Sequence, residues 1–401
     1  MRPAATPPHL GTIILLVGLS VASLNMFLPA LPEMARDFGA SEAAMGLAVS
    51  GYLIVAGALQ LLLGPLSDRI GRRPVILGAL AVYALASVGC LLADSLTVFL
   101  VCRLAQGTVI AGSIVTMAAL RDMYPPREAA GKLGTVAAAM ALAPMLGPPL
   151  GGVLDTVIGW RAIFVLYAVL GTGAVALVWA DFGETQSGTA RPLAAQVAAW
   201  RALLGSGAFW AYALCTGFSV GVFYVFLTGA PFVAVGVFGL STAALGVGLG
   251  SISGGYMLGS AVAARLSPQV GLGPLILAGR LVAVGGLGLG ALCFALGLSH
   301  PVLLFAATLS VGLGNGFTLA NTHAGALSVR PDLAGSAAGL AGAMQLLGGA
   351  ALTSVTLAWL GGGVSALRLL ALMIAVALAA LAFGVMAVRN GRRLGIDGGP
   401  A

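Results

Sequence analysis

The sequence predicts an all-α membrane protein with twelve transmembrane helices, arranged as two pseudo-symmetric halves of six. Three observations support this class. Of the 401 residues, 59% are hydrophobic and only 8% are charged, and the mean hydropathy is +1.05. Such a chain has too little polar surface to cover a water-soluble globule. In addition, long charge-free runs recur along the chain, and two segments repeat at a constant offset.

The charge-free runs set the order of the expected helices, because one membrane span needs about 20 apolar residues. Seven runs each fit one helix: 3–32, 43–67, 74–93, 104–120, 133–154, 162–180 and 369–388. Three longer runs must fold back to form several helices: 202–264, 281–329 and 333–367. Turns or polar breaks at 238–241, 324–325 and 330–331 divide the longer runs. The total is about twelve.

An internal repeat divides the chain. The segment FGASEAAMG (38–46) aligns without a gap on FGLSTAALG (238–246). A second segment agrees at the same offset, since Leu66, Ser67, Gly71 and Pro74 align on Leu266, Ser267, Gly271 and Pro274. We therefore expect one six-helix half over 1–180, a cytoplasmic connector over 181–206, and a second half with a short cytoplasmic tail over 207–401. Parallel halves of this kind generate alternating access by rocking about a central site.

The positive charges predict the orientation. Most of the nineteen lysine and arginine residues fall in loops on one side of the expected membrane. The exceptions are Arg36, Arg161 and Arg368 in outer loops, and Arg103 and Arg280 inside helices. The positive-inside rule then places both termini in the cytoplasm. This asymmetry also accounts for the net charge of +7, so no nucleic-acid partner is implied.

A charged motif follows the second helix. GPLSDRIGRRP (64–74) combines one acid, three arginines and two turn-making glycines in a short loop. It resembles the signature loop of the major facilitator superfamily, which implies a conformational latch. The latch residues are Gly64, Asp68, Arg69, Gly71, Arg72 and Arg73, and we expect Arg72 to pair with Asp122. We expect Asp68 to face the start of the helix near 332–335. The alternative is that the arginines only set topology.

Arg103 lies inside the fourth expected helix, where a charge costs about 2.5 to 3.5 kcal/mol near the membrane centre. The surrounding CRLAQG (102–107) resembles the helix-four motif of drug exporters, whose arginine faces the central cavity and is linked to proton coupling. A purely structural arginine bonded to backbone carbonyls is the alternative. Arg280, in the ninth helix, is expected to extend to the inner surface.

The fifth helix carries APMLGPPLGG (143–152). Its prolines and glycines should kink the helix or loosen its hydrogen-bond ladder. The order of residues resembles the antiporter motif of exporters, which the resemblance places at Pro144, Gly147, Pro148, Gly151 and Gly152.

Three further segments, LNMFLPALPEMARDFG (24–39), ALRDMYPP (119–126) and APF (230–232), narrow the resemblance to the Bcr/CflA group of multidrug exporters. That group usually has an aspartate where Asn25 stands. Its proton-binding role therefore does not transfer to this position, because an asparagine does not titrate.

Candidate substrate contacts come from helix faces that should line a central cavity. They are Asn25, Tyr52, Gln106, Met140, Met145, Phe218, Tyr224, Asn321 and Gln345. Aromatic and methionine side chains suit varied apolar ligands, although each residue taken singly fits a packing role better. His323 is interpreted as a hydrogen-bonded interfacial histidine rather than a proton relay.

Proton coupling is expected at a carboxylate near a helix end, because no acid lies at mid-membrane. Asp122 comes first, then Glu33 or Asp155, with Arg103 assisting. Since Asn25 also cannot attract a cation by charge, neutral substrates should be preferred.

The sequence thus predicts a proton-driven exporter of small drug-like molecules in the bacterial inner membrane. Its expected partners are an amphipathic or neutral drug, protons and lipids, with no cofactor and no metal site, and we expect a monomer. The alternatives are a gradient-independent facilitator or metabolite permease of the same fold, and, less favoured, a membrane enzyme. The twelve acids are scattered rather than clustered, which argues against the enzyme.

Overall fold

The computed structural model describes residues 6–186 and 193–396, and all regular structure within these ranges is helical. Inside the helix over 126–158, the side chains at 126, 127, 130, 137–139 and 141 are outside this description. Residues 187–192 of the expected connector and 397–401 of the expected tail also lie outside it. The chain forms two compact units, which divide at residue 193. This point falls within the expected connector, and the expected domain limits stay a prediction.

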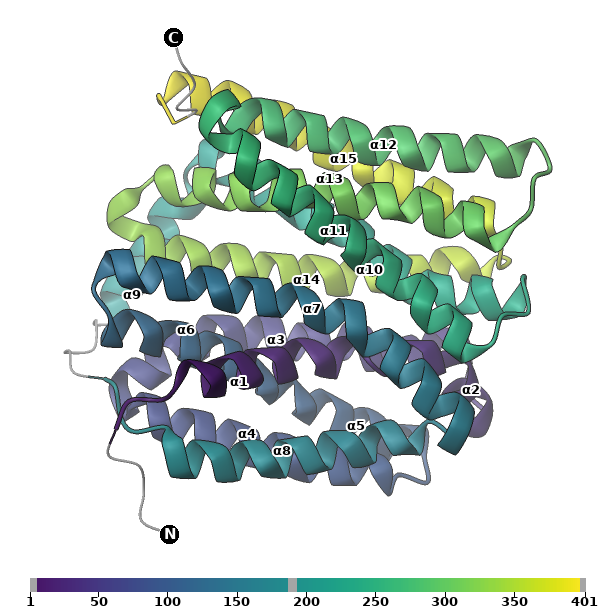
Figure 1. Ribbon diagram of the computed structural model, residues 1–401, viewed down its shortest axis with the longest axis horizontal. Helices are drawn as coiled ribbons and strands as arrows, with labels where there is room; N and C mark the ends of the chain where they lie inside the picture. The colour runs from purple at the N-terminus through teal and green to yellow at the C-terminus, as the bar shows by residue number, and fades with distance from the viewer. Residues whose placement is uncertain (1–5, 187–192, 397–401) are drawn as a thin grey trace. The chain divides into compact units, whose positions relative to one another are not determined.

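Unit 1 ends at Leu193, within the expected connector, and contains the helices up to α8 (Figure 1). Its helices are α1 (Leu10–Asn25), η1 (Leu28–Ala30), α2 (Leu31–Asp37), α3 (Glu42–Ile70), α4 (Arg72–Leu91), α5 (Leu96–Gln106), η2 (Gly107–Ile110), α6 (Ala111–Met123), α7 (Pro126–Ile158) and α8 (Arg161–Asp181). Within this unit α4 packs along α8, and α1 packs along α7.

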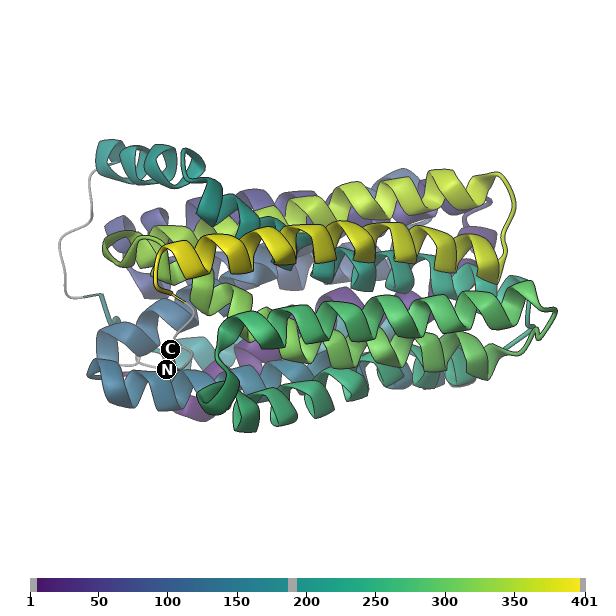
Figure 2. The same cartoon turned by 90° about the horizontal axis from the view of Figure 1, so that it is seen from above.

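Unit 2 contains the remaining helices. They are α9 (Leu193–Leu204), α10 (Gly207–Gly236), α11 (Thr242–Val270), α12 (Leu272–Ala295), α13 (Pro301–Ser328), η3 (Pro331–Leu333), α14 (Ala334–Gly361) and α15 (Ala366–Arg393). The short α9 precedes α10 at one end of the unit-2 helices (Figure 2). Within this unit α13 packs against α11 and α12, and α10 packs against α14 and α15.

The two repeated segments have the same local structure in both units. Ser41 caps α3 by accepting a hydrogen bond from the Ala44 amide, and Ser241 caps α11 in the same way from Ala244, both at 3.2 Å. The glycine two residues before each cap has positive φ, +59° at Gly39 and +65° at Gly239, a conformation that favours glycine. The repeat seen in the sequence therefore reflects a shared turn-and-cap structure.

Close packing of small residues holds unit 2 together. A Cβ on Gly312 of α13 would meet the Ile252 carbonyl of α11, and a Cβ on Gly314 would meet the Gly279 carbonyl of α12. Glycine lets the helix backbones approach closely where no hydrophobic force acts between helices in lipid. Gly312 and Gly314 thus serve helix packing in this unit.

Two spans of unit 1 are interrupted. α1 ends at Asn25, and η1 begins at Leu28 with Pro29 at its second position. α5 passes into α6 through the 3-10 turn η2. In contrast, α7 is assigned as one helix through Pro144, Pro148 and Pro149.

Within the described residues, 11 helical segments are long and apolar enough to cross a membrane. They correspond to α1 with α2, α3, α4, α5 with α6, α8, and α10 to α15. α7 is 33 residues long and contributes a shorter apolar segment, Leu142–Ile158. The chain is therefore a polytopic helical membrane protein.

Candidate functional site

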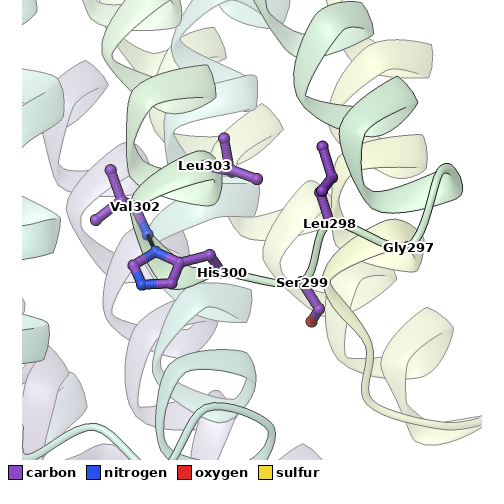
Figure 3. Close-up of a pocket in the computed structure, with 6 residues that line it drawn as sticks. All are labelled: Gly297, Leu298, Ser299, His300, Val302 and Leu303. Atoms are coloured by element: carbon purple, nitrogen blue, oxygen red, sulfur yellow. Dashed lines mark hydrogen bonds between the residues drawn. The ribbon is translucent and has the colours of Figure 1, made fainter.

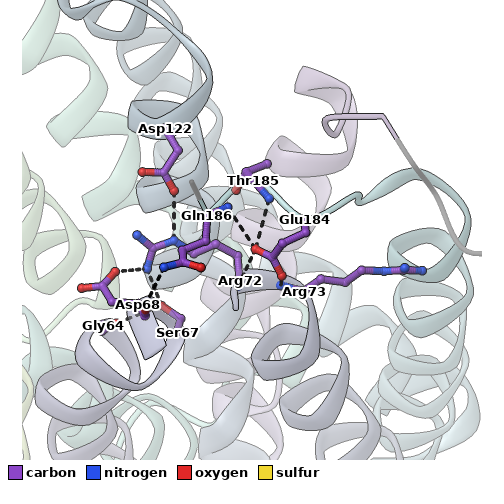
Figure 4. A network of polar contacts seen from close by, with 9 residues as sticks. All are labelled: Gly64, Ser67, Asp68, Arg72, Arg73, Asp122, Glu184, Thr185 and Gln186. Atoms are coloured by element: carbon purple, nitrogen blue, oxygen red, sulfur yellow. Dashed lines mark hydrogen bonds and ion pairs between the residues drawn. The ribbon is translucent and has the colours of Figure 1, made fainter. Parts of the chain in front are cut away.

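The charged motif spans the end of α3 and the start of α4, so that the expected short loop is reduced to Gly71. Its side chains form a polar network at the end of unit 1 (Figure 4). Arg72 Nε donates to Asp122 Oδ2 at 3.0 Å, which confirms the expected ion pair. Arg72 also pairs with Asp68 one turn earlier and donates from Nη1 to Ser67 Oγ at 2.5 Å. Only 8% of the Arg72 side chain is exposed. A guanidinium fixed by three partners ties the ends of α3, α4 and α6 together.

The remaining motif residues play smaller parts. The Gly64 carbonyl accepts a hydrogen bond from Ser67 Oγ at 2.9 Å. Arg73 Nη2 donates to the Trp179 carbonyl at 2.8 Å, and its guanidinium lies over the Trp179 ring. Arg69 is exposed. The expected approach of Asp68 to the segment near 332–335 stays a prediction.

A residue that sequence reasoning missed completes this network. The Glu184 carboxylate accepts the backbone amides of Arg72 at 2.8 Å and Arg73 at 3.2 Å, at the N-terminus of α4. A carboxylate there satisfies free amides and complements the helix dipole. Gly71 has φ of +101°, and a Cβ on it would collide with the Glu184 carboxylate. Gly71 is thus needed both for the turn and for the space that Glu184 occupies.

The segment around Glu184 is fixed on both sides. Gln186 Nε2 donates to the Asp68 carbonyl at 2.7 Å. The Gly183 amide donates to the Thr6 carbonyl at 2.9 Å, and Asp181 accepts the His9 amide at 3.0 Å. We call residues 182–186 the clasp, because they join the end of α8 to the latch. No sequence pattern links Glu184 to Arg72, which lies 112 residues earlier.

Arg103 occupies a closed polar site inside unit 1, and its side chain is fully buried. Its Nε donates to the Ala48 carbonyl at 3.3 Å, and its Nη2 to the Ser23 carbonyl at 2.9 Å. The Phe27 and Tyr52 rings lie over the guanidinium at 4.2 and 4.4 Å. The structure thus contains the carbonyl bonds of the structural alternative, and coupling through Arg103 stays a prediction.

Gln106 belongs to the same site. It accepts from Arg103 Nη1 at 2.6 Å and donates to Ser87 Oγ at 2.8 Å. Both Gln106 and Tyr52 are therefore part of the packed shell around Arg103, and both are buried.

The interruption of α1 explains how Arg103 is stabilised. Ser23 lies in the last turn of α1, where carbonyls lack their next helical partner and the dipole is negative. Its carbonyl accepts from Arg103 and from Tyr167 Oη at 3.2 Å. Two aromatic faces add cation–π attraction. A helix end therefore offsets the positive charge without a carboxylate among the described contacts of Arg103.

Asn25 ends α1 beside the antiporter motif of α7. Its Nδ2 donates to the Val21 carbonyl at 2.7 Å, whereas the buried Oδ1 has no hydrogen-bond partner among the described residues. A Cβ on Gly147 would lie 3.8 Å from Asn25 Cβ, and a Cβ on Gly151 would collide with the Met26 carbonyl. The glycines of the motif therefore let α7 lie directly against the break in α1.

The other motif and coupling candidates lie apart from Arg103 in the described contacts. Pro144 is half-buried, Pro148 and Gly152 are buried, and Met145 is half-buried. Met140 packs against the core cluster of Ile13, Val17, Leu120 and Val136. Glu33 lies in the first turn of α2 and is half-buried, and Asp155 is buried near the end of α7.

The candidate contacts of unit 2 are held by neighbours within that unit. Phe218 stacks on Phe383 with ring centroids 5.5 Å apart. Tyr224 packs its ring on Gly349. Asn321 Nδ2 donates to the Phe317 carbonyl at 2.7 Å, and Gln345 Nε2 lies 2.8 Å from His323 Nε2.

The expectation for Arg280 was wrong. Its side chain does not extend to a surface but is fully buried. Nε donates to Thr318 Oγ1 at 3.0 Å and Nη2 to Asn315 Oδ1 at 2.7 Å, both on α13. Because these polar side chains replace water, the arginine is retained inside the unit.

A surface depression at the turn between α12 and α13 lies apart from these networks (Figure 3). It is lined by Gly297, Leu298, Ser299, His300, Val302 and Leu303. His300 caps α13 by accepting from the Val302 amide at 3.3 Å. The depression therefore belongs to a helix start and not to the candidate site.

Comparisons with known proteins agree with this architecture. The sequence profile of the Major Facilitator Superfamily matches residues 13–353. A chloramphenicol resistance protein of Pseudomonas aeruginosa is 33% identical over 331 residues, which cover 79% of this chain and 76% of that protein. The multidrug transporter MdfA of Yersinia pestis (bv. Antiqua, strain Angola) is 30% identical over 315 residues, covering 72% and 77%.

A solved structure shares the fold. The crystal structure of a bacterial homolog of the human lysosomal transporter Spinster, inward-facing and occupied, matches with a TM-score of 0.75 at 18% identity, covering 98% of both chains. The family profile and the transporter relatives indicate a membrane transporter rather than an enzyme. The chain belongs to the Major Facilitator Superfamily. The resemblance stated from its motifs is confirmed.

Proposed function

We propose that this protein exports small, neutral, drug-like molecules across the bacterial inner membrane in exchange for protons. The observation that carries the proposal is the likeness to a chloramphenicol resistance protein and a multidrug transporter over about three quarters of each. α7 supports it, because its glycines bring the antiporter motif against the end of α1.

The topology completes the proposal. α7, with 33 residues, is the twelfth span in addition to the 11 apolar segments. Residues 1–180 and 207–401 form the two halves, and both termini lie in the cytoplasm, as the positive-inside rule requires. The protein acts as a monomer.

Asp122 links proton binding to the latch in this proposal. Its carboxylate accepts Arg72 Nε, and 24% of its side chain is exposed, so solvent protons reach it. A protonated Asp122 no longer attracts Arg72 by charge. The Arg72–Asp122 bond then weakens and the start of α4 is held less tightly to the end of α6, which favours opening. Glu33, Asp155 and Arg103 are the secondary candidates for coupling.

The test is efflux of chloramphenicol, a neutral probe, from a pump-deficient host and from proteoliposomes. We expect uphill efflux that an imposed pH gradient accelerates and a protonophore abolishes. Asp122→Asn should lose the acceleration, whereas Glu128→Gln, a more exposed acid paired with Lys132, should retain it. Full gradient-driven efflux in Asp122→Asn would contradict the assignment of Asp122.

The second candidate is a facilitator of the same fold that needs no gradient. The observation that favours it is Asn25, an amide beside α7 where an acid would titrate. A facilitator would equilibrate chloramphenicol but never move it uphill. Equal rates with and without the pH gradient in the wild type would select this alternative.

A further inference from the structure

His323 lies within α13 and is half-buried. The chain has three histidines, and the other two, His9 and His300, occupy the N-cap positions of α1 and α13. In the described spans the acids lie in the first or last turns of their helices, whereas His323 is five residues before the end of α13. Histidine titrates between about pH 5 and 8. Among the described acids and histidines of these spans, His323 therefore lies farthest from the nearest helix end.

The contacts of the ring define its neutral form. His323 Nε2 lies 2.8 Å from Gln345 Nε2 on α14. A neutral imidazole donates from one nitrogen and accepts at the other. With its hydrogen on Nδ1, the ring has a bare Nε2 that accepts from the Gln345 amide. This contact is then satisfied without charge.

The neighbours of His323 supply no carboxylate in the described contacts. On α10 the Tyr212 ring packs at Gly325, and on α11 Ser267 bonds Asn321. On α12 the nearest charge is Arg280, bonded to Thr318. In the loop before η3, Arg330 pairs with Asp332, and on α15 the charges lie at the helix ends, Arg368 at one and Arg389, Arg392 and Arg393 at the other.

The sequence favoured a hydrogen-bonded interfacial histidine over a proton relay at this position. From the position of His323 and its contact with Gln345, we propose instead that His323 takes up and releases a transported proton, with Gln345 as the group that responds. The inference rests on the proposed proton exchange and adds a coupling residue in unit 2. A proton from water binds the bare Nε2, and the ring becomes an imidazolium. The Gln345 NH2 group cannot face the new N–H, so the amide rotates and its Oε1 accepts that bond. Release of the proton reverses both changes.

This exchange alters the contact between two spans. The imidazolium lies on α13, the helix to which Arg280 of α12 is hydrogen-bonded. Two positive charges repel more strongly in a low dielectric. Protonation therefore favours arrangements of α13 and α14 that let water reach the ring. A substrate that binds better to the arrangement in which the ring is shielded from water expels the proton. This is the linkage that antiport requires.

Direct titration tests the first step. In a single-histidine protein carrying His9→Gln and His300→Gln, the ring nitrogens of labelled His323 are followed by NMR from about pH 5 to 8. We expect a change from one bare nitrogen to two protonated nitrogens, with a midpoint that Gln345→Leu shifts. A ring that keeps one bare nitrogen throughout this range would overturn the proposal, and this measurement does not depend on replacing His323.

Transport tests the second step in proteoliposomes with chloramphenicol as the probe. Glutamine at position 323 can bond Gln345 but cannot titrate. In His323→Gln we expect the efflux rates with and without the pH gradient to become equal, while His300→Gln keeps the acceleration. Undiminished acceleration in His323→Gln would refute the assignment. A wild type without any acceleration would instead refute proton exchange as the function and leave the NMR titration to judge His323.

Discussion

Arg103 and Arg280 are two buried arginines that use different partners. Arg103 is bonded to backbone carbonyls at a helix end and enclosed by two rings, whereas Arg280 is bonded to two polar side chains of α13. The charge of Arg103 in a helix could be read from the sequence, and so could its need for compensation. The partners could not, because Asn315 and Thr318 lie 35 and 38 residues from Arg280 and have no charge. This is why the expected surface position of Arg280 was wrong.

Arg103→Lys should lower efflux strongly while the protein still inserts. A lysine carries one point charge and cannot reach Ala48, Gln106 and Ser23 together. The loss of two bonds to a buried charge costs about 3 kcal/mol, so the melting temperature in detergent should fall too. Arg161→Lys, at an exposed arginine, is the matched control. Wild-type efflux in Arg103→Ala would show that the residue has no part in coupling.

Glu184→Ala should loosen the latch, because it leaves the Arg72 and Arg73 amides without their acceptor. The expected loss is about 1 kcal/mol of stability, as for a helix cap. Transport should slow, and Glu184→Gln, which keeps one acceptor oxygen, should lie between alanine and wild type. The measurements are thermal unfolding and chloramphenicol efflux. If Glu184→Ala and Glu128→Ala behave alike, the clasp has no specific role.

At the scale of elements, the buried polar site around Arg103 lies where two spans are interrupted. The run 3–32 is charge-free throughout, so composition predicted a span but not its end at Asn25. The 3-10 turn over Gly107–Ile110 was also hidden inside an apolar run. At both breaks, side chains of other helices donate hydrogen bonds to backbone carbonyls. The sequence pattern of one helix does not reveal such contacts. In α7, Pro144, Pro148 and Pro149 lie within one continuous helix, and the expected kink or loosened ladder stays a prediction.

Gly151→Ala should weaken the packing of α7 on α1, because the added Cβ collides with the Met26 carbonyl. Backbone atoms cannot move aside cheaply, so we expect a loss of about 1 to 3 kcal/mol and slower transport. Gly134→Ala on the same helix meets no atom within 4 Å and serves as the control. It should leave stability unchanged or raise it by about 0.5 kcal/mol. Equal melting temperatures for the two variants would contradict this account of the motif.

At the scale of the molecule, the internal repeat was predicted best. The segments that align in sequence share their caps and positive-φ glycines, because turn geometry depends on a few local residues. The clasp and the Gln345–His323 contact had no such signal, since they join residues far apart in sequence or require knowledge of helix rotation. Turns and helix caps could therefore be predicted from the local sequence, whereas contacts between residues of different elements could not.

Asn25→Asp should extend transport toward cations. The Asn25 side chain is buried, and its Nδ2 donates to the Val21 carbonyl. A carboxyl oxygen at that place can bond this carbonyl only when it carries a proton, so the protonated form of the aspartic acid is favoured in this arrangement. When it ionises, it attracts cationic substrates by charge. Efflux of one neutral and one monocationic dye is measured for wild type and variant. Strong efflux of the cation by the wild type would disprove the preference for neutral substrates.

The clasp has a consequence for how this protein tolerates being divided. Its residues 182–186 follow α8 in sequence but complete the latch of unit 1 through Glu184 and Gln186. A transporter expressed as two polypeptides should therefore assemble well when the cut falls after Gln186, and poorly when it falls before Phe182. On this expectation, the first half must include the Glu184 carboxylate, which lies three residues beyond the end of α8 at Asp181.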